Sequence, residues 1–143
     1  MVRKNKTSNY SPKNYDVREA ENIFYLKSHP SRINKLLAHY ELYKKIKNYP
    51  GNILECGVYK GASLMRWAQF RQSLENNDSR SIYGFDVFGS FPKEGLKSSL
   101  DKKFVDEYDD GGGIGINVKD LEEIFKKKKI FKYLFSKRKR VIY

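Results

Sequence analysis

The sequence predicts an α/β fold built on one strand–helix–strand unit, and three observations lead to this prediction. Two short apolar runs, residues 52–58 and 81–85, have the character of strands, and a helical pattern lies between them. Glycines mark the turn between the first strand and the helix. The whole unit spans about 35 residues, which is the size of a βαβ unit with two parallel strands.

Length and composition limit the class of protein. The chain has 143 residues, of which 39% are hydrophobic and 15% are aromatic. This length allows one domain, and the apolar content is too high for a disordered chain. No apolar run approaches the roughly 18 residues of a membrane span, and the charged N-terminus is not followed by the apolar stretch of a signal peptide. We therefore expect a cytoplasmic protein with no membrane partner.

The positive charge is concentrated at one end of the chain. Lys and Arg number 29 against 17 Asp and Glu, a formal net charge of +12. Residues 125–143 hold nine basic and no acidic residues, so the remainder carries a net charge of only +3. The basicity therefore belongs mainly to the C-terminal residues and does not describe the whole surface.

Two segments precede the strand–helix–strand unit. Residues 1–20 are polar without apolar periodicity, and we expect a flexible lead-in there. A helical segment is expected over residues 21–50, with Ser28 capping its main helix and Pro30 in the first turn. Helical spacing gives this helix one apolar face, made of Ile33, Leu36, Leu37, Tyr40 and Tyr43.

The unit itself begins with the strand over residues 52–58. Tyr59-Lys60-Gly61 is the expected turn, and Ala62 opens a helix that breaks at residues 76–79. The second strand ends at Asp86. We expect a loop and a polar connection up to Asp110.

A final helix and a third strand are expected after this connection. The glycine-rich residues 111–115 break the chain, and Asn117 caps a helix that runs to about Lys128. Acidic residues in its first turns and lysines in its last turn suit the helix dipole. Residues 131–135 are apolar and aromatic enough to begin a third strand.

Gly57, Gly61 and Asp86 together indicate a nucleotide-type site. Open α/β sheets bind such ligands at the carboxyl end of a strand, beside a helix N-terminus. Gly57 would let the chain turn sharply, and Gly61 would let the helix begin close to the ligand. Asp86 is placed to accept hydrogen bonds from ribose hydroxyls. The alternative is that these are ordinary turn glycines and that Asp86 caps a loop.

The residue types in the turn favour S-adenosylmethionine over NAD. The dinucleotide fingerprint requires a second glycine where this chain has Tyr59. Glu55 would repel a pyrophosphate, but it suits a cofactor with a cationic amino-acid end and no phosphate. An NAD-binding fragment remains an alternative.

Two segments, Asn52–Ser63 and Tyr83–Pro92, resemble the TylF/MycF-type (macrocin-type) O-methyltransferase family. The similarity extends over roughly Phe24 to Phe125. Members of this family are class I, S-adenosylmethionine-dependent enzymes that methylate sugar hydroxyls with a metal ion. The resemblance implies a Rossmann-like class I methyltransferase fold and methyl transfer to a sugar or another small-molecule hydroxyl.

The resemblance also implies roles for individual residues. The methionine end of the cofactor would lie against Glu55, Gly57 and residues 61–63, and Asp86 would hold the ribose. The candidate cofactor-binding residues are Glu55, Gly57, Tyr59, Gly61, Ala62, Ser63 and Asp86. They lie in an expected cofactor-binding half over residues 51–130, and no residue is assigned as the catalytic base.

The chain ends before the part of the family that carries the metal ligands and catalytic acids. The resemblance therefore implies a divalent metal such as Mg²⁺ whose ligands are not in this chain. It also implies that this chain corresponds to only the N-terminal half of the fold and is a fragment that is inactive by itself. Whether the chain forms a homo-oligomer is left open by the sequence.

A basic tail is expected over residues 131–143. Together with Lys126–Lys129 and its interleaved aromatic residues, this tail could contact phosphates and stack on bases. A non-catalytic basic nucleic-acid-binding module is therefore an alternative function. We favour a solvated helix end and expect no nucleic-acid partner.

The remaining residues of interest have structural interpretations. Cys56, the one cysteine, excludes an internal disulfide, and we expect it to be a small buried residue of the first strand. His29 and His39 lack partners at metal-ligand spacing. Trp67 lies at helical spacing from apolar neighbours and is expected in the core.

Overall fold

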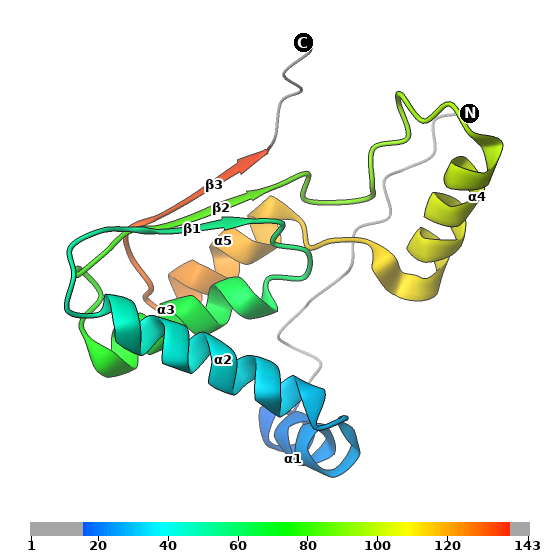
Figure 1. Cartoon of the computed structure of the whole chain (residues 1–143). Helices are drawn as coiled ribbons and strands as arrows, with labels where there is room; N and C mark the ends of the chain where they lie inside the picture. The colour runs from blue at the N-terminus through cyan, green and yellow to red at the C-terminus, as the bar shows by residue number, and fades with distance from the viewer. Residues whose placement is uncertain (1–15, 138–143) are drawn as a thin grey trace.

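The computed structural model describes residues 16–137 (Figure 1). In chain order its elements are α1 (Val17–Lys27), α2 (Ser31–Ile46), β1 (Ile53–Cys56), α3 (Ala62–Leu74), β2 (Ile82–Asp86), α4 (Ser99–Tyr108), the single wide turn η2 (Asp109–Gly113), α5 (Val118–Lys127) and β3 (Tyr133–Lys137). Within residues 16–137, no helix is both long enough and apolar enough to cross a membrane.

The strands form one parallel sheet in the order β1-β2-β3. Ile53 pairs with Ile82, and Ile82 pairs with Tyr133. This confirms the α/β fold, because helix α3 connects two adjacent parallel strands as the sequence predicts. Three strands in this order correspond to one half of a doubly wound sheet, in which β1 lies at the point where the strand order reverses.

One face of the sheet carries the helices. Figure 1 shows α2, α3 and α5 on the same side of the three strands. Gly84 of β2 faces them, and a Cβ atom there would lie 3.1 Å from the side chains of Val58 and Phe135. On the opposite face Leu54 is 65% exposed and Leu134 is 54% exposed. No helix of the described residues covers that face.

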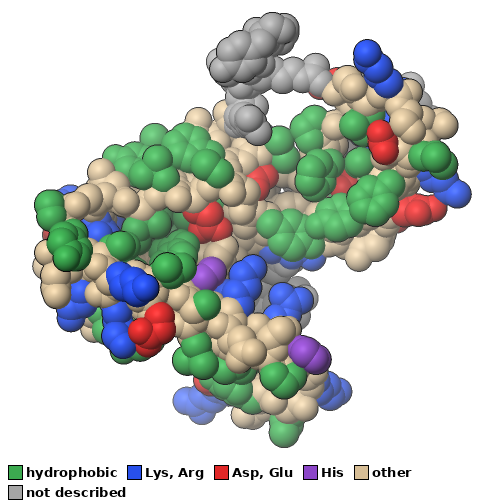
Figure 2. Space-filling view, viewed as in Figure 1, with side chains coloured by type: hydrophobic (Ala, Val, Ile, Leu, Met, Phe, Trp, Pro, Cys, Tyr) green, Lys and Arg blue, Asp and Glu red, His purple; other side chains and the backbone are tan. Residues whose placement is uncertain are grey.

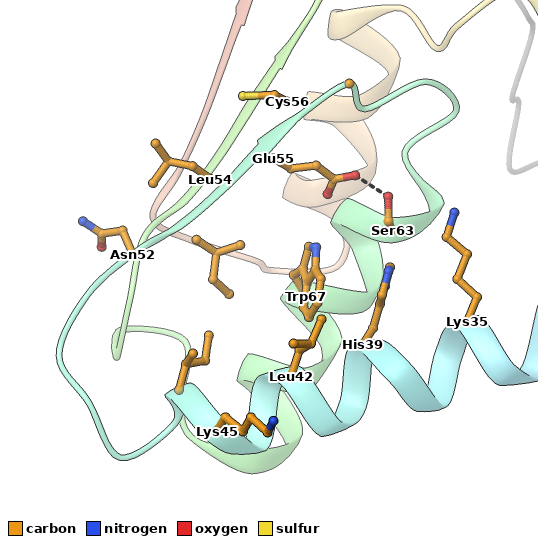
Figure 3. Close-up of a pocket in the computed structure, with 13 residues that line it drawn as sticks. Lys35, His39, Leu42, Lys45, Asn52, Leu54, Glu55, Cys56, Ser63 and Trp67 are labelled. Carbon is orange, nitrogen blue, oxygen red and sulfur yellow. Dashed lines mark hydrogen bonds between the residues drawn. The ribbon is translucent and has the colours of Figure 1, made fainter.

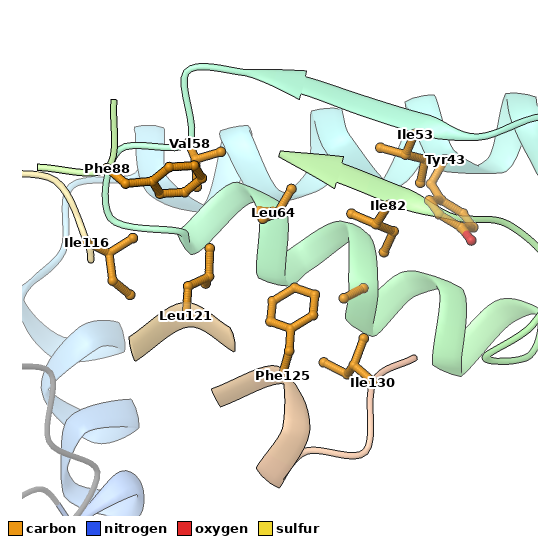
Figure 4. Packing of buried hydrophobic residues seen from close by; sticks show 11 residues of the cluster. Tyr43, Ile53, Val58, Leu64, Ile82, Phe88, Ile116, Leu121, Phe125 and Ile130 are labelled. Atoms are coloured by element: carbon orange, nitrogen blue, oxygen red, sulfur yellow. The ribbon is translucent and has the colours of Figure 1, made fainter. Parts of the chain in front are cut away.

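The core lies between the covered face of the sheet and the helices (Figure 4). Leu64 of α3 and Phe125 of α5 are fully buried in it. The ring of Phe125 contacts those of Tyr133 and Phe135 in β3, each with centroids 4.9 Å apart. The other buried members of the cluster are Tyr43, Ile53, Val58, Ala68, Ile82, Phe88, Ile116, Leu121 and Ile130.

A buried arginine joins helix α3 to the beginnings of two strands. The side chain of Arg71 is fully buried and donates from Nη1 to the carbonyl oxygen of Arg80 at 2.6 Å. Its Nη2 donates to the carbonyl oxygen of Phe131, also at 2.6 Å. Because these carbonyls precede β2 and β3, one guanidinium fixes where both strands begin.

Helix α2 is held beside α3 by a largely buried ion pair. Arg80 donates from Nη2 to Oε1 of Glu75 at 2.7 Å, and the hydroxyl of Tyr43 donates to the same carboxylate. The Arg80 side chain also donates to the carbonyl oxygens of Ile46 and Lys47 at the end of α2. The hydrogen bond to Arg80 lowers the pKa of Glu75, so this carboxylate stays ionised.

The N-terminal helices begin at different residues from those expected. Val17–Ala20, within the lead-in expected over residues 1–20, form the first turns of α1 because Asp16 caps it, accepting from the Arg18 N–H at 2.9 Å. Residues 1–15 lie outside the described residues. Ser28 follows the end of α1 and does not cap α2, where Nδ1 of His29 accepts from the Ser31 N–H at 3.2 Å. Leu37, expected on the apolar face of α2, is exposed.

The polar connection expected after Asp86 contains a helix that sequence analysis missed. Ser98 caps α4 by accepting from the Leu100 N–H at 3.1 Å. Val105 is the one buried residue of α4, while Leu100 and Phe104 are exposed. Helix α4 therefore contributes a single buried side chain to the protein.

The C-terminal elements follow the prediction. Asn117 caps α5 by accepting from the Lys119 N–H at 2.8 Å, and the third strand is present as β3. The tail expected over residues 131–143 therefore contains a strand up to Lys137. Its remaining residues, 138–143, lie outside the described part of the chain.

Replacing Arg80 should be strongly destabilising. Arg80→Ala leaves the Glu75 carboxylate in a largely buried place without its cation, so we expect the free energy of unfolding to fall by about 3 kcal/mol. Urea denaturation followed by circular dichroism measures this change. Lys127→Ala, which removes an exposed ion pair with Glu123, is the control and should leave the midpoint unchanged. Equal effects of both substitutions would contradict this role of Arg80.

Candidate functional site

The turn between β1 and α3 requires unusual backbone conformations. Gly57, Tyr59 and Gly61 all have positive φ angles, of 91°, 53° and 83°. A Cβ atom on Gly61 would lie 3.1 Å from Cδ1 of Leu121 in α5. Glycine at this position therefore lets α3 begin close to α5, in addition to its freedom of backbone conformation.

Asp86 at the end of β2 holds this turn in place. Its Oδ2 accepts a hydrogen bond from the Tyr59 N–H at 2.9 Å, and its Oδ1 accepts one from the Phe88 N–H at 3.0 Å. One carboxylate therefore joins the loop after β1 to the loop after β2. This is the loop-capping role that sequence analysis left as an alternative for Asp86.

A third segment closes against both loops. The Ile116 N–H donates to the carbonyl oxygen of Tyr59 at 2.8 Å, and the Gly115 N–H donates to that of Gly89 at 3.1 Å. A Cβ atom on Gly115 would lie 3.2 Å from both of these carbonyl oxygens. Gly115 is thus required by the close approach of three backbone segments at the carboxyl edge of the sheet.

Glu55 points from β1 to the first turn of α3. The Ser63 hydroxyl donates to its Oε1, while its Oε2 is buried without a hydrogen-bond partner among the described residues. Burial raises the pKa of the Glu55 carboxyl, and the Ser63 hydroxyl, the positive charge of Lys35 and the neighbouring Trp67 indole oppose this change. Glu55 is therefore a carboxyl group that can still accept a cation or a hydrogen-bond donor.

Glu55 borders a cavity of about 680 Å³ between β1, α2 and α3 (Figure 3). Gly57 and Ser63 line it beside Glu55, and helix α2 contributes Lys35 and His39 from the opposite side. The remaining lining residues are Leu42, Lys45, Ile46, Asn52, Ile53, Leu54, Cys56 and Trp67. The cavity therefore begins at the carboxyl end of β1 and follows the outer edge of that strand.

His39 and Trp67 form an aromatic wall of this cavity. Their rings stack with centroids 4.5 Å apart and an interplanar angle of 19°. Burial lowers the pKa of His39, and the charges of Arg66 and Lys35 lower it further. A neutral imidazole therefore stands beside the indole at neutral pH, which leaves the lysines as the cationic groups of the α2 wall.

Exposed aromatic side chains lie on the other side of the turn. The rings of Tyr59 and Tyr108 have centroids 6.5 Å apart, and Phe91 and Phe104 also pack against Tyr108. A hydrogen bond with Tyr59 raises the pKa of the Tyr108 hydroxyl. Figure 2 shows hydrophobic side chains gathered over α4 and its neighbouring loops.

The structure divides the seven predicted site residues into three groups. Glu55, Gly57 and Ser63 line the cavity, whereas Tyr59 and Asp86 are bonded to each other at the turn. The other two, Gly61 and Ala62, begin α3, and Ala62 is exposed. Their roles in binding a cofactor stay predictions.

Sequence analysis missed Lys35 and His39 as cavity residues, and it placed Trp67 in the core only. Lys35 and His39 precede the glycine turn by about twenty residues. The one available signal was their spacing of four residues, which places both side chains on the same face of a helix. Cys56 was expected to be buried and is exposed, because β1 is an edge strand and Cys56 lies on the uncovered face of the sheet.

No metal-ligand set is present in the part of the chain that the structure describes. Among residues 16–137, no group of three or more His, Cys, Asp or Glu side chains is arranged to hold a metal ion.

Comparisons with known proteins give partial structural matches. No protein-family model and no curated protein matches the chain. The apo structure of CalS11, a TDP-rhamnose 3′-O-methyltransferase of calicheamicin biosynthesis, is 23% identical, with a TM-score of 0.49 over 90% of this chain and 49% of CalS11. A second structure of this calicheamicin methyltransferase is 27% identical, with a TM-score of 0.46 over 68% of this chain and 43% of the other. The chain thus spans less than half the length of these proteins, and TM-scores below 0.5 do not assign its function.

Removing the Asp86 carboxylate should loosen both loops. Asp86→Ala leaves the Tyr59 and Phe88 N–H groups without their acceptor, so we expect the free energy of unfolding to fall by about 2–3 kcal/mol. Urea denaturation is the measurement, and Asp110→Ala, which changes an exposed carboxylate in η2, is the control. An Asp86→Ala protein as stable as the wild type would show that the two hydrogen bonds do not maintain the turn.

The raised pKa of Glu55 predicts a pH dependence of stability. The folded protein holds the Glu55 proton to a higher pH than the unfolded chain, so stability falls as pH rises from the ordinary glutamate value of 4.5 to the folded pKa. Glu55→Gln lacks this decrease, and its stability relative to wild type should therefore rise over the same pH range and then level off. Urea midpoints of both proteins between pH 4.5 and about pH 7 measure the difference. Parallel profiles would mean that the Glu55 pKa is not raised.

Proposed function

We propose that this chain binds S-adenosylmethionine and forms the cofactor-binding part of an O-methyltransferase that acts on a sugar or another small-molecule hydroxyl. The observation that carries the proposal is the half-buried carboxyl of Glu55, which lines a cavity at the carboxyl end of β1. When bound, S-adenosylmethionine supplies an electrophilic methyl group. The residues of this chain would bind and orient it.

The amino-acid end of the cofactor suits the cavity. Its ammonium group would donate to the Glu55 carboxylate in a charge-assisted hydrogen bond. Ionisation of Glu55 is favoured by a bound cation, so binding would lower the pKa that burial raises. Gly57, which carries no side chain, leaves the carboxyl end of β1 open to the ligand.

Asp86 can serve the turn and a ribose together. Each of its oxygens accepts one backbone N–H group in this structure. A carboxylate has about four lone-pair sites, so each oxygen keeps capacity for a further donor. We propose that the ribose hydroxyls donate there, while the two backbone hydrogen bonds hold the carboxylate in a fixed orientation.

NAD fits the same residues less well. A dinucleotide needs its pyrophosphate close to the backbone of the turn, where Tyr59 adds a side chain. S-adenosylmethionine carries no phosphate and avoids this conflict.

The proposal names the methyl acceptor only by its chemical class and assigns no catalytic base. The family resemblance implies a hydroxyl acceptor, and no side chain of residues 16–137 is assigned as the base. Nucleic-acid binding through the basic residues near the C-terminus stays the alternative function. The closely spaced lysines at the end of α5 would give it a steep salt dependence.

Competitive calorimetry tests the choice of cofactor. We expect the protein to bind S-adenosylhomocysteine or S-adenosylmethionine more tightly than NAD, and Glu55→Gln to weaken binding on the order of tenfold, because a charge-assisted hydrogen bond is lost. Affinity should also rise with pH through the pKa of Glu55 in the wild type, and not in Glu55→Gln. Tighter binding of NAD would refute the proposal.

A further inference from the structure

The cavity holds groups of both charges near its Glu55 end. Lys35 projects from α2 toward the region of Ser63 and Glu55, as Figure 3 shows. Its positive charge acts on Glu55 and on His39, lowering the pKa of each. The Lys35 ammonium therefore lies within electrostatic range of both groups.

Lys35 has no fixed partner of its own. Among residues 16–137 it makes no ion pair or hydrogen bond, whereas Lys44 on the same helix pairs with Glu41 at 3.0 Å. The Ser63 hydroxyl donates to Oε1 of the Glu55 carboxylate. One end of the cavity thus has a carboxylate and an unpaired cation among its lining residues.

These two groups complement an α-amino acid. Such a group carries an ammonium and a carboxylate on one carbon atom, and it requires an anion and a cation placed side by side. His39 cannot provide the cation at neutral pH, because burial and the neighbouring charges lower its pKa. Lys45, the other lysine of the cavity, lies ten residues farther along α2, or about 15 Å at the rise of an α-helix.

We propose that Lys35 of α2 binds the carboxylate of the amino-acid end of the ligand, opposite Glu55, and so selects ligands with a complete amino-acid group. This inference rests on the proposed function and extends the site to a helix outside the strand–helix–strand unit. Helix α2 is held in the required place by the Arg80–Glu75 ion pair near its C-terminus.

Three nucleosides separate the contribution of Lys35 from that of Glu55. S-adenosylhomocysteine has both charged groups, its decarboxylated analogue has the ammonium without the carboxylate, and 5′-methylthioadenosine has neither. Lys35→Met should weaken S-adenosylhomocysteine on the order of tenfold, should not weaken the decarboxylated analogue, and should leave 5′-methylthioadenosine unchanged. Lys35→Arg should restore most of the affinity, and Glu55→Gln should weaken both ligands that carry an ammonium.

Lys44→Met is the matched control, since it removes a lysine of the same helix that pairs with Glu41 and does not line the cavity. It should leave all three affinities unchanged. An equal effect of Lys35→Met on all three nucleosides, or no effect on S-adenosylhomocysteine, would overturn the role of Lys35 while the cofactor proposal stands. If the wild type binds none of the three, the proposed function fails, and this inference fails with it.

Discussion

The arrangement of the site depends on the carboxylate of Asp86. Parallel strands end at the same edge of a sheet, but the loops that leave them have no regular hydrogen bonds to keep them together. Asp86 provides one on each side, to Tyr59 in the loop after β1 and to Phe88 in the loop after β2. Tyr59 then accepts from Ile116 and brings in a third segment. These hydrogen bonds thus hold the glycine turn in place without a ligand.

The cavity depends on a second constraint, the position of α2. Its walls come from β1 and α3 on one side and from α2 on the other, and α2 reaches this place through the buried network of Arg80, Glu75 and Tyr43. A charged network at one end of the helices therefore keeps Lys35 and Glu55 facing one cavity at the other end. Because Lys35 takes no part in that network, a substitution of Lys35 can change ligand binding without removing the interactions that hold α2 in place.

The strands, the helix between them and the glycine turn could be predicted because local sequence determines them. The exposed helix and the cavity could not be predicted, because they depend on tertiary packing. The strand–helix–strand unit followed from two apolar runs and from Gly57 and Gly61, whose conformations few other residues adopt. Helix α4 lies in a stretch that was interpreted as a polar connection, and Val105 is its one buried residue. Lys35 was missed because a lysine on an exposed helix face carries no sign of the cavity that another element places beside it. Cys56 was expected to be buried because an apolar strand does not reveal that one of its faces is uncovered.

A nuclear magnetic resonance titration of the ¹⁵N-labelled protein with S-adenosylhomocysteine tests the central claim most directly. The account predicts that the largest amide shifts occur at Gly57, Gly61 and Ser63, with smaller shifts along the neighbouring face of α2. Shifts confined to the lysines at the end of α5, or to the uncovered face of the sheet, would contradict it.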